Sequence, residues 1–231
     1  MTGTTFSTFL AEIAHDRIFV IDASIEKSHY MPIDLSETNT DLKHFDITCA
    51  TAWQEYISST LSSQNKQVAY GGYLEQRSIY SRSDYFNTQQ PESERNIHLG
   101  VDLWIAAGTS VLAAFNGEIH SFQDNTNYGD YGPTIILKHR INTVTFYTLY
   151  GHLSRESLVS LKVGDRVKAG DCIAVLGDAA VNGNYAPHLH FQVILDLQEK
   201  RGDYPGVTCT RDLEFYKNNC PDPTIILGLG K

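Results

Sequence analysis

Two histidines stand one residue apart in the run Pro187-His188-Leu189-His190-Phe191, which is followed by the apolar residues Val193 and Ile194. This pattern predicts a strand, and because side chains alternate along a strand, both imidazoles project from the same face. Imidazole is the commonest neutral metal ligand near pH 7. One ring can therefore bind a metal while the other transfers a proton, and the spacing leaves open which ring does which.

Two other runs supply the partners that such a site needs. His98-Leu99-Gly100-Val101-Asp102 offers a histidine and a carboxylate, and Tyr150-Gly151-His152 adds a histidine at the end of another strand-like run. A catalytic zinc site uses about three protein ligands and keeps a position for water, whereas a structural site closes with about four, usually including cysteines. With no cysteine pair beside these runs, the open kind of site is favoured.

The chemistry of an open zinc site with two spare histidines suits amide hydrolysis. Zinc would lower the pKa of its bound water and polarise a scissile carbonyl. A nearby neutral imidazole could take the proton of the water, and a second could hydrogen-bond the developing oxyanion.

The elements that position these residues are mostly strands. Stretches rich in β-branched and aromatic residues are separated by Gly, Asn, Asp and Pro, which predicts an antiparallel β-sandwich or barrel-like fold. The predicted strands cover residues 101–105, 110–114, 117–120, 134–137, 144–150, 172–176 and 188–195.

The flanking parts have a different pattern. Apolar spacing predicts a short helix ending near Ile13, a buried strand over 18–21 and a second helix over 48–61. At the other end, residues 211–219 are expected to form a short helix and 224–227 an edge strand. We therefore predict an N-terminal α/β appendage (1–70), a domain that contains the candidate metal site (71–200) and a C-terminal extension (201–231).

Composition excludes several classes of partner. The chain has 231 residues, of which 42% are hydrophobic, and its formal charge of −9 comes without any basic run. We therefore expect neither a nucleic acid nor an anionic membrane surface as partner. The first 24 residues contain no signal peptide or membrane span, which predicts a cytoplasmic protein. The pattern predicts no particular oligomeric state.

Cysteines and isolated histidines are interpreted as structural. The four cysteines show no C-x-x-C spacing, so we expect reduced thiols, with a bridge between Cys209 and Cys220 as the alternative. Five histidines stand without metal-binding company and are interpreted as surface or satisfied core residues: His15, His29, His44, His120 and His139.

The three histidine-containing runs also carry a family resemblance. His98-x-x-x-Asp102, Tyr150-Gly151-His152-Leu153 and His188-Leu189-His190-Phe191 occur in the order and approximate spacing of the lysostaphin-like zinc metallopeptidases, many of which cut peptidoglycan cross-bridges or stem peptides. Residues 163–170 resemble the glycine turn of the duplicated-hybrid-motif barrel. The resemblance implies that His98, Asp102 and His190 bind zinc, and that His152 and His188 act on the water and the oxyanion.

Substrate contacts are expected in the segment before the first ligand. Loops beside a site often carry such contacts, and Arg77 and Tyr80 are our candidates there. Tyr150, two residues before His152, is a third candidate, with a place in the core as the alternative.

The predicted function is that of a zinc-dependent metalloendopeptidase that hydrolyses a peptide amide bond, with peptidoglycan-type peptides or fragments as the default substrate. One alternative is a catalytically silent binding or regulatory module on the same fold. Another is an intracellular amidase acting on a small amide, because residues 71–73, 79–83, 130–132 and 220–223 are similar to a branch joined to a class III aminotransferase and a small-molecule kinase-like domain.

Overall fold

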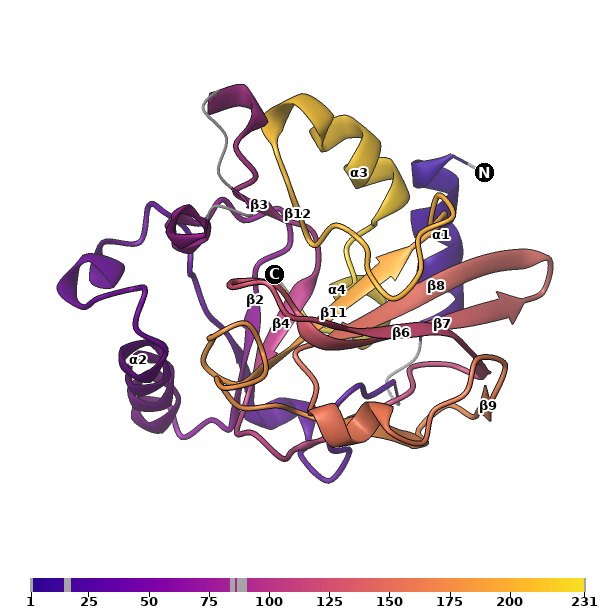
Figure 1. Cartoon of the computed structure of the whole chain (residues 1–231), viewed down its shortest axis with the longest axis horizontal. Coiled ribbons are helices and arrows are strands. Elements are labelled where there is room, and N and C mark those ends of the chain that lie inside the picture. Colours follow the sequence, from indigo (N-terminus) through magenta and orange to yellow (C-terminus); the bar gives the residue numbers. More distant parts are fainter. Residues whose placement is uncertain (1, 15–17, 84–85, 87–90, 231) are drawn as a thin grey trace.

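The computed structural model of the chain describes residues 2–14, 18–83, 86 and 91–230, and its centre is an eight-stranded sheet (Figure 1). The strand order is β1-β2-β4-β11-β8-β7-β6-β9, and two short ladders, β10-β5 and β12-β3, lie beside it. Only the edge pair β1-β2 of the eight-stranded sheet is parallel. The strands are β1 (Tyr30–Pro32), β2 (Val68–Gly71), β3 (Ile97–His98), β4 (Val101–Trp104), β5 (Ser110–Leu112), β6 (Gly117–Asn125), β7 (Gly132–Ile141), β8 (Val144–Gly151), β9 (Arg166–Val167), β10 (Cys172–Val175), β11 (His188–Ile194) and β12 (Val207–Thr208).

The helices lie around this sheet. Figure 1 shows α2 at the lower left, outside β2, whereas α1 and α3 lie at the upper right, above β8. They are α1 (Gly3–Ile13), α2 (Ala50–Ser63), α3 (Leu213–Asn219) and α4 (Thr224–Leu227), with short 3₁₀ turns that include Ser78–Arg82. No helix within the described residues is long and apolar enough to cross a bilayer.

The prediction of a mainly β fold is confirmed, and all seven predicted stretches contain a strand. The sheet does not close into a barrel. Two predicted strands are wrong: residues 18–21 form only the single bridge Ile21–Val111, and 224–227 form helix α4. Asp222 explains the second error, because its Oδ1 accepts bonds from the backbone N and hydroxyl of Thr224, which starts a helix.

The central strand β11 separates the core from the site by simple alternation. Leu189, Phe191 and Val193 are fully buried in the main hydrophobic cluster. His188 and His190 therefore face the other side of the sheet.

The first seventy residues contribute to the same sheet. Strand β1 and most of β2 lie within them, and β2 pairs with β4, which carries Asp102. The division at residues 70 and 200 stays a prediction. The structure has four free cysteines, with Cys209 and Cys220 buried and Cys49 and Cys172 exposed, so the alternative Cys209–Cys220 bridge is not formed.

Candidate metal centre

Strand register brings the predicted ligands together. His190 on β11 lies directly opposite Asp102 on β4, and His188 lies opposite Trp104. Directly opposed side chains on one face are neighbours, so the Trp104 ring stacks on His188 with centroids 4.0 Å apart. His98 reaches the same point because Gly100 lets the chain pass over His190: a Cβ on Gly100 would lie 2.6 Å from the His190 ring.

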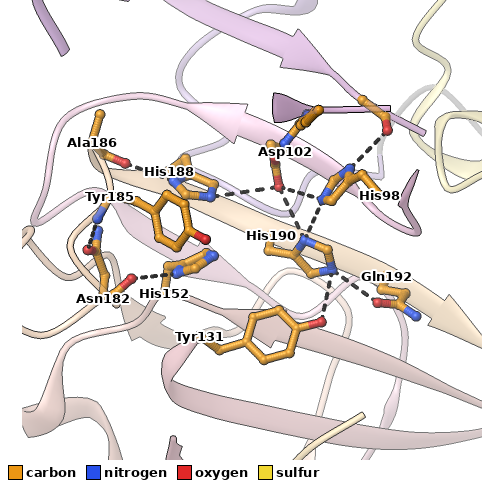
Figure 2. Close-up of polar contacts among 12 residues, drawn as sticks. His98, Asp102, Tyr131, His152, Asn182, Tyr185, Ala186, His188, His190 and Gln192 are labelled. Carbon is orange, nitrogen blue, oxygen red and sulfur yellow. Dashed lines mark hydrogen bonds and ion pairs between the residues drawn. The ribbon is translucent and has the colours of Figure 1, made fainter. Parts of the chain in front are cut away.

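His152 reaches the site through an unusual backbone conformation. Gly151 lies opposite His190, so regular alternation would turn the next side chain toward the core. His152 instead has φ of 64°, in the left-handed region that non-glycine residues rarely adopt. This conformation brings the ring of His152 beside that of His188, with ring centroids 4.1 Å apart (Figure 2).

The hydrogen-bond partners of His98 and His190 fix which ring nitrogen faces the site. Nδ1 of His98 lies 2.9 Å from the carbonyl oxygen of Gly72, which can only accept, so this Nδ1 carries the proton. The side-chain amide of Gln192 donates to the carbonyl oxygen of Pro205, which turns its Oε1 toward Nε2 of His190, 3.0 Å away. Nε2 of His190 is therefore the donor. The remaining nitrogens, His98 Nε2 and His190 Nδ1, point unprotonated at each other across 2.8 Å.

Two lone pairs at this distance need a cation between them, and the donor set fits zinc. His98 Nε2 and His190 Nδ1 lie 3.3 and 3.2 Å from Asp102 Oδ1, and the three ligand residues form a cluster of potential metal ligands. Atoms bound tetrahedrally at ~2.0–2.1 Å from one zinc ion are about 3.3 Å apart. Both carboxylate distances match this spacing, and the nitrogen pair is slightly closer.

The two further histidines are oriented in the same way. Nδ1 of His152 donates to the carbonyl oxygen of Asn182 at 2.9 Å, and Nδ1 of His188 donates to that of Ala186 at 2.8 Å. Their Nε2 atoms are therefore free of protons. Figure 2 shows both rings beside the ligand cluster, with His188 Nε2 3.8 Å from Asp102 Oδ1.

Burial keeps these imidazoles neutral. It lowers the pKa of His98 and of His188 to about 4, and it is the main cause that holds the pKa of His152 well below its usual value. Burial opposes ionisation of Asp102, but His98 and Arg77 hold the pKa of its carboxyl well below the ordinary range. At neutral pH these three rings are thus neutral and Asp102 is charged, the protonation states that metal binding needs.

Arg77, predicted as a substrate contact, lies behind the ligand Asp102. Its Nη1 donates to Asp102 Oδ2 at 2.6 Å and its Nε to Glu75 Oε2 at 2.6 Å, and the side chain is only 4% exposed. It also lines the cavity above the site. Its ion pairs are therefore with Glu75 and with the ligand carboxylate of Asp102, which it orients and neutralises.

The other two predicted substrate residues have contrasting positions. Tyr80 lines the cavity next to Phe86, with ring centroids 5.2 Å apart. Tyr150 lies opposite the core residue Phe191, and its hydroxyl accepts a bond from the backbone N of Ala114 in the main core. The left-handed conformation of His152 explains why Tyr150 lies in the core although His152 lies in the site. It places the side chains of residues 150 and 152 on opposite faces of the sheet. Tyr150 is thus a core residue, the alternative considered from the sequence.

Several residues that support the site were missed. Trp104 under His188, Gln192 beside His190, and Tyr131, whose ring centroid is 5.0 Å from that of His190, were not proposed for the centre. Alternation from His188 through His190 could have identified Gln192. The other two residues depend on long-range pairing.

The comparison with known proteins matches this centre to one family. Residues 96–201, which contain all five predicted metal and catalytic residues, match Peptidase family M23. Two curated relatives are the glycyl-glycine endopeptidase ALE-1 of Staphylococcus capitis, 39% identical over 41% of this chain and 24% of its own length, and lysostaphin of Staphylococcus staphylolyticus, 38% identical over 42% of this chain and 18% of its own length. The chain thus spans about a quarter or less of the length of these relatives.

Among solved structures, the catalytic domain of the antimicrobial peptidase lysostaphin from Staphylococcus simulans is 26% identical, with a TM-score of 0.40, over 67% of this chain and 95% of that one. The similarity to the aminotransferase-joined branch stays a prediction. The resemblance to lysostaphin-like zinc metallopeptidases is confirmed by the match of residues 96–201 to Peptidase family M23 and by the similarity to ALE-1 and lysostaphin.

Proposed function

We propose that this chain is a zinc-dependent peptidase that hydrolyses a peptide amide bond, with peptidoglycan-type peptides as the default substrate. The supporting observation is the convergence of three ligand atoms at zinc-like spacing with two further proton-free imidazole nitrogens. ALE-1 is a glycyl-glycine endopeptidase, and lysostaphin is an antimicrobial peptidase, which supports a peptide bond as the target.

His98, Asp102 and His190 would hold the metal. When bound there, zinc would supply a Lewis acid that makes water more acidic and a carbonyl more electrophilic. The carbonyls of Gly72, Asn182 and Ala186 and the amide of Gln192 each keep one histidine in the tautomer that the site uses.

His152 and His188 would move the proton. A neutral imidazole that donates Nδ1–H to a carbonyl can accept a proton only at Nε2, which faces the cavity in both residues. After one of them takes the proton of the attacking water, the same Nε2–H can donate to the developing oxyanion or to the leaving nitrogen. Water is thereby added across the C–N bond, giving a carboxylic acid and an amine.

The test combines metal analysis with product identification. Protein purified without chelator is analysed for zinc, and is then incubated with muropeptides, glycine-rich peptides and small cytosolic amides, with products identified by mass spectrometry. We expect about one zinc per chain and cleavage of at least one amide. Absence of stoichiometric zinc would instead support the silent-module alternative, and bound zinc without any cleavage would count against the peptidase assignment.

A further inference from the structure

The candidate centre lies in a small cavity whose metal-binding and catalytic side chains are buried. The metal and catalytic side chains are at most 5% exposed, and the cavity above them measures about 180 Å³. Small-molecule sites usually measure about 300–1,000 Å³, and a cavity of about 150 Å³ is filled by one benzene ring. The space therefore suits a single residue-sized group rather than a stretch of polypeptide.

The first wall of this cavity comes from residues that precede the match to Peptidase family M23. Ile79, Tyr80 and Phe86 line it and are all buried, and they precede residue 96, where the match to the family begins. Trp53, near the start of α2, lines the cavity from the same part of the chain. These four lining residues thus lie outside the part of the chain that matches the family.

This first wall is held against the opposite loop. Nη1 of Arg82 donates to the carbonyl of Asn184 at 3.0 Å, Nη2 donates to that of Gly183 at 3.3 Å, and the guanidinium lies 4.2 Å above the Tyr185 ring. Ser83 Oγ donates to the carbonyl of Tyr128 at 2.6 Å. Since Tyr185 also lines the cavity, these contacts join two sides of it.

The second wall, residues 204–207, is joined to the strands that carry the ligands. Gly206 accepts a bond from the backbone N of Leu99 at 2.8 Å, and Val207 accepts one from Arg95 Nε at 2.9 Å. β12 pairs with β3, which carries His98. The Tyr131 hydroxyl packs so closely against Gly206 that a Cβ there would lie 1.9 Å from it. Moving this wall would disturb the ligand His98 itself.

From this small volume and the hydrogen bonds that hold its walls, we infer that the site takes a short amide by one free end and excludes the interior of a long or cross-linked peptide. The inference rests on the proposed function and narrows its substrate class to dipeptide-sized compounds, including released peptidoglycan fragments. A scissile bond inside a long chain needs space on both sides of the metal, and the described walls leave about one residue-sized volume.

Two peptide pools test this inference in the zinc-loaded full chain: mixed free dipeptides, and mixed hexapeptides blocked at both ends. We expect kcat/KM for the dipeptides to exceed that for the hexapeptides by at least about tenfold, because even one surplus group in a closed pocket is discriminated by that order. Internal cleavage of blocked hexapeptides at an equal or higher rate would overturn the inference.

Binding gives a readout that does not depend on turnover. The chain has two tryptophans, and both Trp53 and Trp104 line the cavity, so their fluorescence reports its occupancy. In zinc-loaded His152→Ala, dipeptides should change the emission and blocked hexapeptides should not. If dipeptides bind but the wild type cleaves nothing, the peptidase assignment fails while the inference stands. If neither pool, or only the long pool, changes the emission, the inference is wrong.

A wall variant links the selectivity to the closure. Arg82→Ala removes the contacts between the first wall and the opposite loop, and should raise the relative rate on blocked hexapeptides about tenfold. Arg155→Ala is the matched control, because Arg155 pairs with Asp124 on the surface and does not line the cavity. Ser83→Ala, which removes one wall bond, is the milder variant if Arg82→Ala melts early. Unchanged selectivity in a folded wall variant would refute the role of the closure.

Discussion

Replacing Arg77 by methionine separates two roles for this residue. The arginine is 4% exposed, and its two 2.6 Å ion pairs neutralise Asp102 and Glu75, which are 1% and 13% exposed. Removing one partner of a buried ion pair leaves an uncompensated charge and costs about 3–5 kcal/mol. We therefore expect the free energy of unfolding of metal-free Arg77→Met to fall by about that amount.

Zinc should reduce this loss. A bound cation would take over part of the compensation of Asp102, so the difference between Arg77→Met and wild type should be smaller with zinc than without it. Urea unfolding with and without zinc measures both values. Arg77→Lys is the control, because it keeps the charge but not the forked geometry, and its loss should be smaller.

The opposite result would support a substrate contact at Arg77. If metal-free Arg77→Met unfolded within about 1 kcal/mol of wild type, while KM rose and zinc affinity stayed the same, the structural role argued from the ion pairs would be wrong. The prediction from the sequence would then hold instead.

Three further perturbations follow from the site and the core. Alanine at any of the three ligand positions should remove zinc and activity together, whereas alanine at His152 or His188 should keep zinc and lower turnover about a hundredfold to ten-thousandfold; full zinc occupancy in Asp102→Ala would contradict the ligand set. Gln192→Leu removes the acceptor of His190 Nε2–H and should weaken zinc binding about 10–100-fold. Competition with a chelator measures the zinc affinity, and Gln54→Leu, at an exposed position, is the control. An unchanged affinity would show that Gln192 does not orient the ligand His190. Burial lowers the pKa of His139 from 6.5 to about 4, so the unfolded chain binds a proton at a higher pH than the folded chain does. The free energy of unfolding should therefore fall between pH 6.5 and pH 4, by about 3 kcal/mol from this group. His139→Gln should show a shallower fall over this range, and an equal fall in both proteins would refute the role of His139.

The part of the site that follows from local periodicity was predictable. Alternation along residues 188–194 placed His188 and His190 on one face and the apolar residues on the other. The register between strands β11 and β4 was not predictable from local periodicity. This register puts His190, and not His188, opposite Asp102, and it depends on the alignment of two strands that are more than eighty residues apart in the sequence.

Two other features depend on contacts that no local pattern reveals. Arg77 and Asp102 are 25 residues apart and form a buried pair. Arg77 is placed there by the bridge between Gln76 and Ile97 and by its backbone hydrogen bond to the carbonyl of Asn96. The helix at Thr224–Leu227 shows the reverse case, since Asp222 carried a local signal that outweighed the strand-like composition of the segment.

The strained residue His152 shows how the surrounding chain maintains the site. A left-handed conformation at a non-glycine residue costs about 1–3 kcal/mol and persists only where its surroundings determine it. Here the backbone N of His152 donates to the carbonyl of Tyr131, its own carbonyl accepts from Gly177, and its Nδ1 donates to Asn182, each at 2.9 Å. Three hydrogen bonds, from Tyr131 and from the segment 177–182, thus hold one residue in a conformation that it would not adopt alone. Because Tyr131 also packs against Gly206 of the second wall, the orientation of this histidine and the closure of the cavity depend on the same contacts.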